Sequence, residues 1–154
     1  MVLEYSRENQ LLFEKMMMST KTCGEFMFIF DTYAWIEYFI GSDKGEIVNR
    51  IVEEQDDTII TLECNIAELK GYCLRQGSDF EESYTIVRAN SEIHSIHIED
   101  WVDAAKIRHD MRKTRKHFGM IDSLIIAFQK KYGGIVVTGD SHFKGLENVI
   151  YLGD

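Results

Sequence analysis

The fold is decided by one apolar stretch that ends in an acidic residue, Phe26-Met27-Phe28-Ile29-Phe30-Asp31. A short, uninterrupted apolar run of this kind is typical of a strand that is buried on both faces, as in a parallel sheet. Residues 32–40 follow with a helical pattern, and Gly41 and Ser42 are predicted to end that helix. The stretch therefore predicts a buried strand, a carboxylate at its carboxyl end and a helix directly after it.

The same alternation of strand and helix continues along the chain. Further strands are predicted at residues 58–61, 93–96, 135–138 and 149–152, and helices at residues 45–54, 63–77, 79–89, 98–116 and 120–132. Strands that alternate with helices imply βαβ units, right-handed crossovers and a central parallel sheet. We therefore predict an α/β fold whose ligands bind beyond the carboxyl ends of the strands.

Length and composition predict one cytoplasmic domain. The 154 residues are 45% hydrophobic and 28% charged, which is ordinary for a soluble protein. No apolar run approaches the roughly 18 residues that span a bilayer, and no secretory signal is visible. The cysteines, Cys23, Cys64 and Cys73, form no C-x-x-C pair and suggest no disulfide framework. These features favour a reducing compartment and no association with a membrane.

The first 24 residues are predicted to be an extension that precedes a domain at residues 25–154. Leu11 to Phe13 and Met16 to Met18 give an apolar side to a candidate helix, which Cys23 and Gly24 separate from the first strand. One hypothesis is an added helix that packs on the domain or on a partner. The other is that translation starts naturally at Met18 or Met27, and the sequence leaves both open.

The charge of the chain is unevenly distributed. A net charge of −9 argues against a protein that holds nucleic acid by bulk attraction. The basic residues nevertheless gather in one short stretch, Lys106, Arg108, Arg112, Lys113, Arg115 and Lys116. A solvated helix face explains such a stretch. Alternatively, Arg112, Lys113, Arg115 and Lys116 bind substrate phosphates or an acidic protein partner.

Four acidic residues stand where the fold brings side chains together. Asp31 and Asp140 each follow a predicted strand, so both are expected at one edge of the sheet. Glu68 lies in the helix after the second strand, and Asp122 lies beside the apolar stripe of helix 120–132. A lone Asp after a strand is usually a turn or cap residue. Four convergent carboxylates would repel one another, and Mg²⁺ or Mn²⁺ is the type of cation that suits an oxygen-only site.

Sequence blocks around these acids resemble those of PIN domains, in order and at reasonable spacing over residues 26 to 152. The blocks are Phe28-Ile29-Phe30-Asp31-Thr32 with Ile36-Glu37-Tyr38, then Ala67-Glu68-Leu69, Ile121-Asp122-Ser123-Leu124-Ile125 and Thr138-Gly139-Asp140-Ser141-His142-Phe143. The resemblance implies a three-layer α/β/α fold around the central parallel sheet. It also implies a Mg²⁺ or Mn²⁺ site and endonucleolytic cleavage of RNA.

Carried over position by position, the resemblance implies that Asp31, Glu68, Asp122 and Asp140 are the catalytic, metal-binding acids. Thr138 resembles the family's hydroxyl residue, a group that positions a metal ligand or a water. The small single domain resembles VapC-type toxins, which are commonly dimeric and paired with an inhibitory antitoxin protein. Which RNA is cut, and whether the site holds one metal ion or two, does not follow from the sequence.

Two aromatic residues depart from the family pattern. Tyr33 stands where a small residue is usual, and Trp35 stands where an aliphatic one is usual. Trp35 is expected to pack in the core. Tyr33 either packs there as well or, because it is close to Asp31, narrows the site or stacks on an unpaired base of the substrate. Glu63 is the alternative to Glu68 if the helix register is shifted.

Other classes of function receive less support. No G-x-S-x-G elbow accompanies His142, and no P-loop or dinucleotide-binding fingerprint occurs. A phosphoacceptor receiver domain gives no role to Glu68 and Asp122. The remaining alternatives are a PIN-like scaffold that binds RNA or protein without cutting, and a solitary RNA-processing nuclease.

Overall fold

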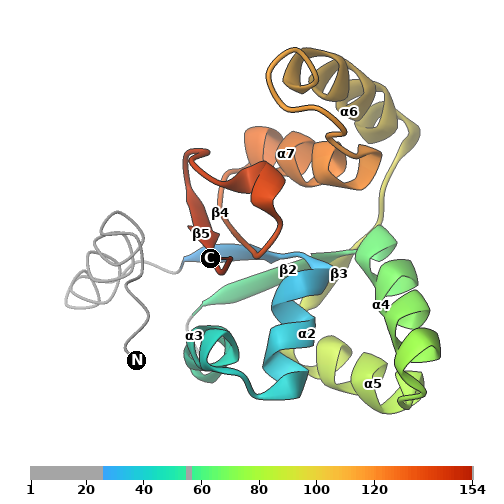
Figure 1. Ribbon diagram of the computed structural model, residues 1–154, viewed down its shortest axis with the longest axis vertical. Coiled ribbons are helices and arrows are strands. Elements are labelled where there is room, and N and C mark those ends of the chain that lie inside the picture. The colour runs from blue at the N-terminus through green and yellow to red at the C-terminus, as the bar shows by residue number, and fades with distance from the viewer. Residues whose placement is uncertain (1–25, 55–56, 154) are drawn as a thin grey trace.

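The computed structural model in Figure 1 describes residues 26–54 and 57–153. In chain order its elements are β1 (Met27–Phe30), α2 (Thr32–Ile40), α3 (Asp43–Glu53), β2 (Thr58–Leu62), α4 (Glu63–Gln76), α5 (Phe80–Asn90), β3 (Glu92–His94), α6 (Ile98–Met111), α7 (Met120–Tyr132), β4 (Ile135–Thr138), the 3₁₀ helix η1 (Ser141–Phe143) and β5 (Val149–Tyr151). The predicted extension at residues 1–24 lies outside the described residues.

The strands form one parallel sheet of five, in the order β3-β2-β1-β4-β5. The central strand, β1, lies within the apolar stretch from Phe26 to Phe30. Phe30, its last residue, lies opposite Thr61 of β2 on one side and Val137 of β4 on the other. Because all strands run in the same direction, Asp31 and Asp140 leave the sheet at the same edge.

Helices cover both faces of the sheet, so the predicted three-layer α/β/α fold is confirmed. Phe28 and Phe30 of β1 pack in one buried cluster, which includes Trp35 of α2 and side chains of α3, α4 and α5. Ile29, between them, points to the opposite face and packs with Leu124 of α7 and other side chains of α6 and α7. Figure 1 shows these two groups of helices on opposite sides of the strands.

Most predicted elements match the structure to within a few residues, but the helix predicted at 98–116 is wrong at its end. Helix α6 stops at Met111, and residues 112–119 form turns. Phe118 is fully buried, and Nε of Arg112 donates to its carbonyl over 3.0 Å. His117 has a left-handed φ of 67°, which a continuing α-helix does not allow. Burial of one aromatic side chain thus overrides the helical pattern.

Across the described ranges, 26–54 and 57–153, no helix is long and apolar enough to cross a membrane.

Candidate functional site

Thr138 connects the two acids that follow neighbouring strands. Asp31, buried at the end of β1, caps α2 by accepting from the backbone N–H of Ala34 through Oδ1 over 2.9 Å. Its other oxygen accepts a hydrogen bond from Oγ1 of Thr138, the last residue of β4. The same hydroxyl oxygen accepts from the backbone N–H of Asp140 over 3.0 Å. Thr138 therefore fixes Asp31 and the start of the Asp140 turn relative to each other.

Burial makes the charge of Asp31 costly. Desolvation raises the pKa of Asp31 to about 7, even though hydrogen bonds from Thr138 and Ala34 act to lower it. The negative charges of Glu68 and Asp140 raise this pKa further. A carboxylate held in this way is stabilised as an anion by a nearby cation.

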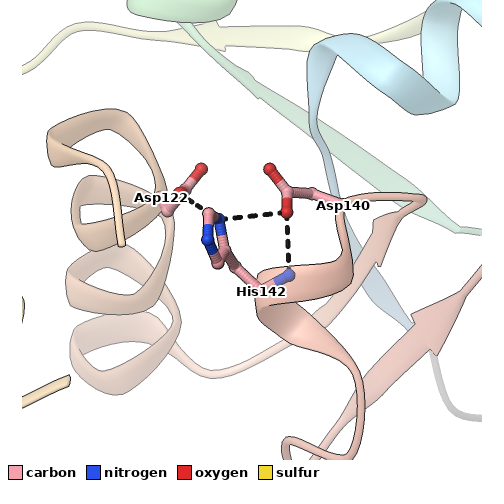
Figure 2. A group of neighbouring side chains, drawn as sticks. All are labelled: Asp122, Asp140 and His142. Atoms are coloured by element: carbon pink, nitrogen blue, oxygen red, sulfur yellow. Dashed lines mark hydrogen bonds and ion pairs between the residues drawn. The ribbon is translucent and has the colours of Figure 1, made fainter. Parts of the chain in front are cut away.

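Asp122, Asp140 and His142 form a compact group at the same edge of the sheet. Nδ1 of His142 lies 3.4 Å from Oδ2 of Asp122 and 3.2 Å from Oδ1 of Asp140. One ligand atom from each of the three residues lies within 4.8 Å of the other two. Figure 2 shows the His142 ring between the two carboxylates, which come from α7 and from the turn after β4.

Backbone hydrogen bonds hold both carboxylates of this group. Oδ2 of Asp122 accepts from the N–H of Gly119, just before α7, over 2.9 Å. Oδ1 of Asp140 accepts from the N–H of His142 over 2.8 Å. Partial burial, together with the charge of Asp140, raises the pKa of Asp122, while the Gly119 hydrogen bond and His142 oppose that shift. Each carboxylate keeps a second oxygen outside these backbone bonds.

Glu68 belongs to a neighbouring polar cluster. It is exposed on α4, and its Oε2 accepts from Oγ1 of Thr32 over 2.6 Å. Nδ2 of the buried Asn65 donates to the same hydroxyl oxygen over 3.2 Å. Since Thr32 directly follows Asp31, this cluster borders the Asp31 carboxylate. The alternative acid, Glu63, instead accepts from the N–H of Ile96 over 2.9 Å and so fastens the segment after β3.

Sequence comparison assigns the family. The model of the PIN domain family matches residues 28–148, which is most of the chain. The chain belongs to the PIN domain family. No curated protein sequence matches it significantly.

Solved structures share the fold of this PIN domain at low sequence identity. A toxin–antitoxin complex from Klebsiella pneumoniae is 18% identical with a TM-score of 0.59, over 80% of this chain and 96% of that one. The Mycobacterium tuberculosis toxin VapC20, which cleaves the sarcin-ricin loop, is 14% identical with a TM-score of 0.64, over 80% and 97% of the chains. VapBC2 of Rickettsia felis, bound to a DNA fragment from its promoter, is 18% identical with a TM-score of 0.60, over 81% and 96%.

The two unusual aromatic residues of this PIN domain have different surroundings. Trp35 is 1% exposed, and its Nε1 donates to Oγ1 of Thr61 over 3.0 Å, so it packs in the core as expected. Tyr33 is partly exposed and packs at the edge of the same core. A Cβ atom built on Gly139 would lie 2.0 Å from the Tyr33 ring. Tyr33 therefore lies against the residue that precedes Asp140, at the border of the acidic group.

The basic residues divide into two kinds. Arg112 and Arg115 donate to backbone carbonyls, of Phe118 over 3.0 Å and of His142 over 2.9 Å. Lys113 and Lys116 are exposed, and Lys113 pairs with Asp110 on the surface. Arg115 thus ties the 112–119 turns to the turn that carries His142, while the two lysines face solvent.

Sequence reasoning did not assign His142 to the site. In the sequence, Asp140-Ser141-His142 suggests only a serine hydrolase, and the G-x-S-x-G elbow of such an enzyme does not occur. The informative feature is the 3₁₀ turn of η1, in which a residue two positions after Asp140 folds back on its carboxylate.

Proposed function

We propose that this PIN domain is a metal-dependent endoribonuclease in which Asp31, Asp122, Asp140 and Glu68 hold a divalent cation, Mg²⁺ or Mn²⁺. The observation that carries the proposal is the convergence of the Asp122 and Asp140 carboxylates, with ligand atoms within 4.8 Å of each other, at the sheet edge where Asp31 follows β1. Carboxylates crowded at a half-buried edge fit a divalent cation, because the cation removes their mutual repulsion.

Bound there, the cation would activate a water molecule and stabilise the negative charge that develops at phosphorus. The chain's own residues would do the positioning. Thr138 holds the Asp31 carboxylate through its hydroxyl, and the N–H groups of Gly119 and His142 hold those of Asp122 and Asp140. Ligands fixed before the cation arrives need little reorganisation during the reaction.

RNA is the proposed substrate, and a toxin–antitoxin pair is the proposed context. Both are supported by structural neighbours of the same fold, one of which is a toxin that cleaves the sarcin-ricin loop and others of which are toxin–antitoxin complexes. We propose an antitoxin protein as the partner, a homodimer as the assembly and the cytoplasm as the place of action. Cys64 and Cys73, which are free thiols, suit that compartment.

Cleavage assays with a matched pair of variants test the nuclease proposal. Asp122→Asn keeps an oxygen that can accept from Gly119 but removes a charged ligand. Asp103→Asn removes an exposed carboxylate of α6 that lies outside the group. Purified protein is incubated with single-stranded RNA in Mn²⁺, in Mg²⁺ and in chelator. We expect metal-dependent cleavage that falls by at least about 100-fold in Asp122→Asn and stays unchanged in Asp103→Asn.

Equal cleavage by wild type and Asp122→Asn would contradict the assignment of this acid. Absence of cleavage by wild-type protein in either metal, with RNA still bound, would favour the PIN-like scaffold that binds without cutting. Expression of the wild-type chain in a bacterial host tests the toxin context. Growth arrest that Asp122→Asn abolishes is expected of a toxin, whereas unimpaired growth favours a solitary RNA-processing nuclease.

A further inference from the structure

His142 occupies a place that the proposed acidic site does not explain. Its Nδ1 atom is buried and lies between oxygens of Asp122 and Asp140, 3.4 Å and 3.2 Å away. Both oxygens are at ion-pair distance, but neither meets the geometry of a hydrogen bond to Nδ1, and no other atom of the described residues does. A buried polar nitrogen without a hydrogen bond is costly. Nδ1 lies between the two carboxylates, which is the position that a third ligand of the same cation needs.

The His142 ring is held in this position from several sides. It packs edge-to-face on the buried Phe118 ring, with the centroids 5.7 Å apart. Its backbone N–H donates to Asp140 over 2.8 Å, and its carbonyl accepts from Nη1 of Arg115 over 2.9 Å. The side chain as a whole is only 29% exposed. Nδ1 is therefore preorganised towards the carboxylates.

We propose that Nδ1 of His142 is a ligand of the divalent cation together with Asp122 and Asp140, and that it makes the site prefer Mn²⁺ to Mg²⁺. The inference rests on the proposed function, because it concerns the same cation. Adjacent ligands of a six-coordinate ion with bonds of about 2.1 Å lie roughly 3 Å apart. The separations of Nδ1 from Oδ1 of Asp140, 3.2 Å, and from Oδ2 of Asp122, 3.4 Å, are close to that value. Each of these oxygens accepts one backbone N–H and keeps a lone pair for the ion.

The preference follows from the chemistry of the ligand. Mg²⁺ takes oxygen ligands and keeps its waters. Mn²⁺ also suits carboxylates, but as the first member of the transition-metal affinity series it gains more from an imidazole nitrogen than Mg²⁺ does. A site of carboxylates alone accepts either ion. A site with one imidazole nitrogen gains affinity for Mn²⁺ and gains little for Mg²⁺. His142 thus distinguishes between two cations that the acids treat alike.

Two variants isolate the contribution of the nitrogen. In His142→Asn the side-chain amide can place an oxygen near the position of Nδ1, while the backbone bonds to Asp140 and Arg115 are retained. In His109→Asn the same replacement is made at an exposed histidine of α6. Mn²⁺ and Mg²⁺ affinities are measured by calorimetry, with thermal unfolding as a check that each variant is folded. We expect His142→Asn to lower the ratio of Mn²⁺ to Mg²⁺ affinity by about 10-fold, and His109→Asn to leave it unchanged.

Pulsed electron paramagnetic resonance of bound Mn²⁺ detects a coordinated nitrogen directly. Wild-type protein labelled with ¹⁵N at histidine is expected to show a directly coordinated nitrogen, and His142→Asn is expected to lack it. Mn²⁺ bound without a coordinated nitrogen, or with an affinity ratio equal to that of His142→Asn, would overturn the inference and leave the nuclease proposal standing. Failure of the wild-type protein to bind either ion would overturn both.

Discussion

Each aspartate of the site has a structural hydrogen bond as well as a proposed catalytic role. Asp31 caps α2, Asp140 caps η1, and Asp122 accepts from the N–H of Gly119 before α7. Capping bonds of this kind stabilise a helix by about 0.5–2 kcal/mol. The structural and the functional interpretations of these acids are therefore compatible, because the backbone bond fixes the orientation of the whole carboxylate.

Thr138 gives the most direct test at the level of single residues. Thr138→Val keeps the shape of the side chain and removes the hydroxyl, while Thr138→Ser keeps the hydroxyl and removes the methyl group. Because the Thr138 hydrogen bond lowers the pKa of Asp31, this pKa should rise in the valine variant and stay nearly the same in the serine variant. The valine variant should also lose about 1–3 kcal/mol of stability, since it leaves a buried acceptor unsatisfied. Carboxyl NMR titration and urea unfolding measure the two effects. A pKa that does not move in Thr138→Val would mean that the hydroxyl does not stabilise the charged form.

How far the sequence predicts the site depends on the range of the interactions involved. The positions of Asp31 and Asp140 follow from strand direction alone, so they could be predicted. The role of Nδ1 of His142 depends on a 3₁₀ turn, on the Phe118 ring and on Arg115, which is 27 residues away. No local pattern contains those three contacts. The position of this nitrogen therefore became visible only in the structure.

Among the elements, the turns at 112–119 show most clearly what helical periodicity cannot predict. The basic stretch has the composition of a helix face, but Arg112 and Arg115 use their side chains to bind carbonyls. The strands and α2, by contrast, agree with the prediction, because short apolar runs and the residues that end them are local features of the sequence. The error at the end of α6 arises from a tertiary contact, the burial of Phe118.

The division of the basic residues makes a prediction about RNA binding. If Lys113 and Lys116 bind phosphates, Lys113→Gln with Lys116→Gln should reduce the slope of log affinity against log salt by about 1.4. Arg115→Gln should instead lower the stability of the turn by about 1 kcal/mol, because it loses a charge-assisted hydrogen bond to the carbonyl of His142. Filter binding at several salt concentrations and urea unfolding separate the two effects. A salt slope unchanged by the double lysine substitution would rule out the phosphate contacts.

The contact between α2 and α3 depends on one glycine. A Cβ atom on Gly45 would lie 2.1 Å from the backbone oxygen of Glu37. This oxygen belongs to the backbone of α2 and cannot move aside as a flexible side chain would. Gly45→Ala should therefore cost about 1–3 kcal/mol of stability. Gly71→Ala in α4 is the control, because its nearest atom is the flexible end of Arg75 at 3.4 Å. This variant should gain about 0.5–1 kcal/mol. Equal midpoints of urea unfolding for the two variants would contradict the close approach.

At the scale of the whole molecule, the site lies where the two buried clusters meet. Phe30 belongs to the cluster under α2 to α5, Leu124 to the cluster under α7, and Asp31 sits at the sheet edge between these layers. The protein also carries a net charge of −9, which a bound divalent cation would reduce. A carboxyl whose pKa differs between the folded and unfolded states makes the free energy of unfolding depend on pH. The charge state of Asp31 is therefore coupled to the stability of the domain.

That coupling predicts how global stability depends on pH in the presence of chelator. The pKa of Asp31 is about 7 in the folded protein against 3.8 as its ordinary value, so between these pH values the folded state binds a proton that the unfolded state has released. The free energy of unfolding should fall as pH rises through this window and level off above pH 7. Asp31→Asn cannot ionise and should lack this loss. Its stability relative to wild type should therefore increase by up to about 4 kcal/mol between pH 4 and pH 8.

Urea unfolding of both proteins at several pH values measures the difference, and the contributions of other titrating groups largely cancel between them. Asp103→Asn, which removes an exposed carboxylate, should run parallel to wild type. Saturating Mn²⁺ should flatten the wild-type curve, because a bound cation favours ionised Asp31 in the folded state. Parallel curves for wild type and Asp31→Asn from pH 4 to pH 8 in chelator would show that burial does not hold this carboxyl protonated. The cost of a buried negative charge at Asp31, which the cation is proposed to offset, would then be absent.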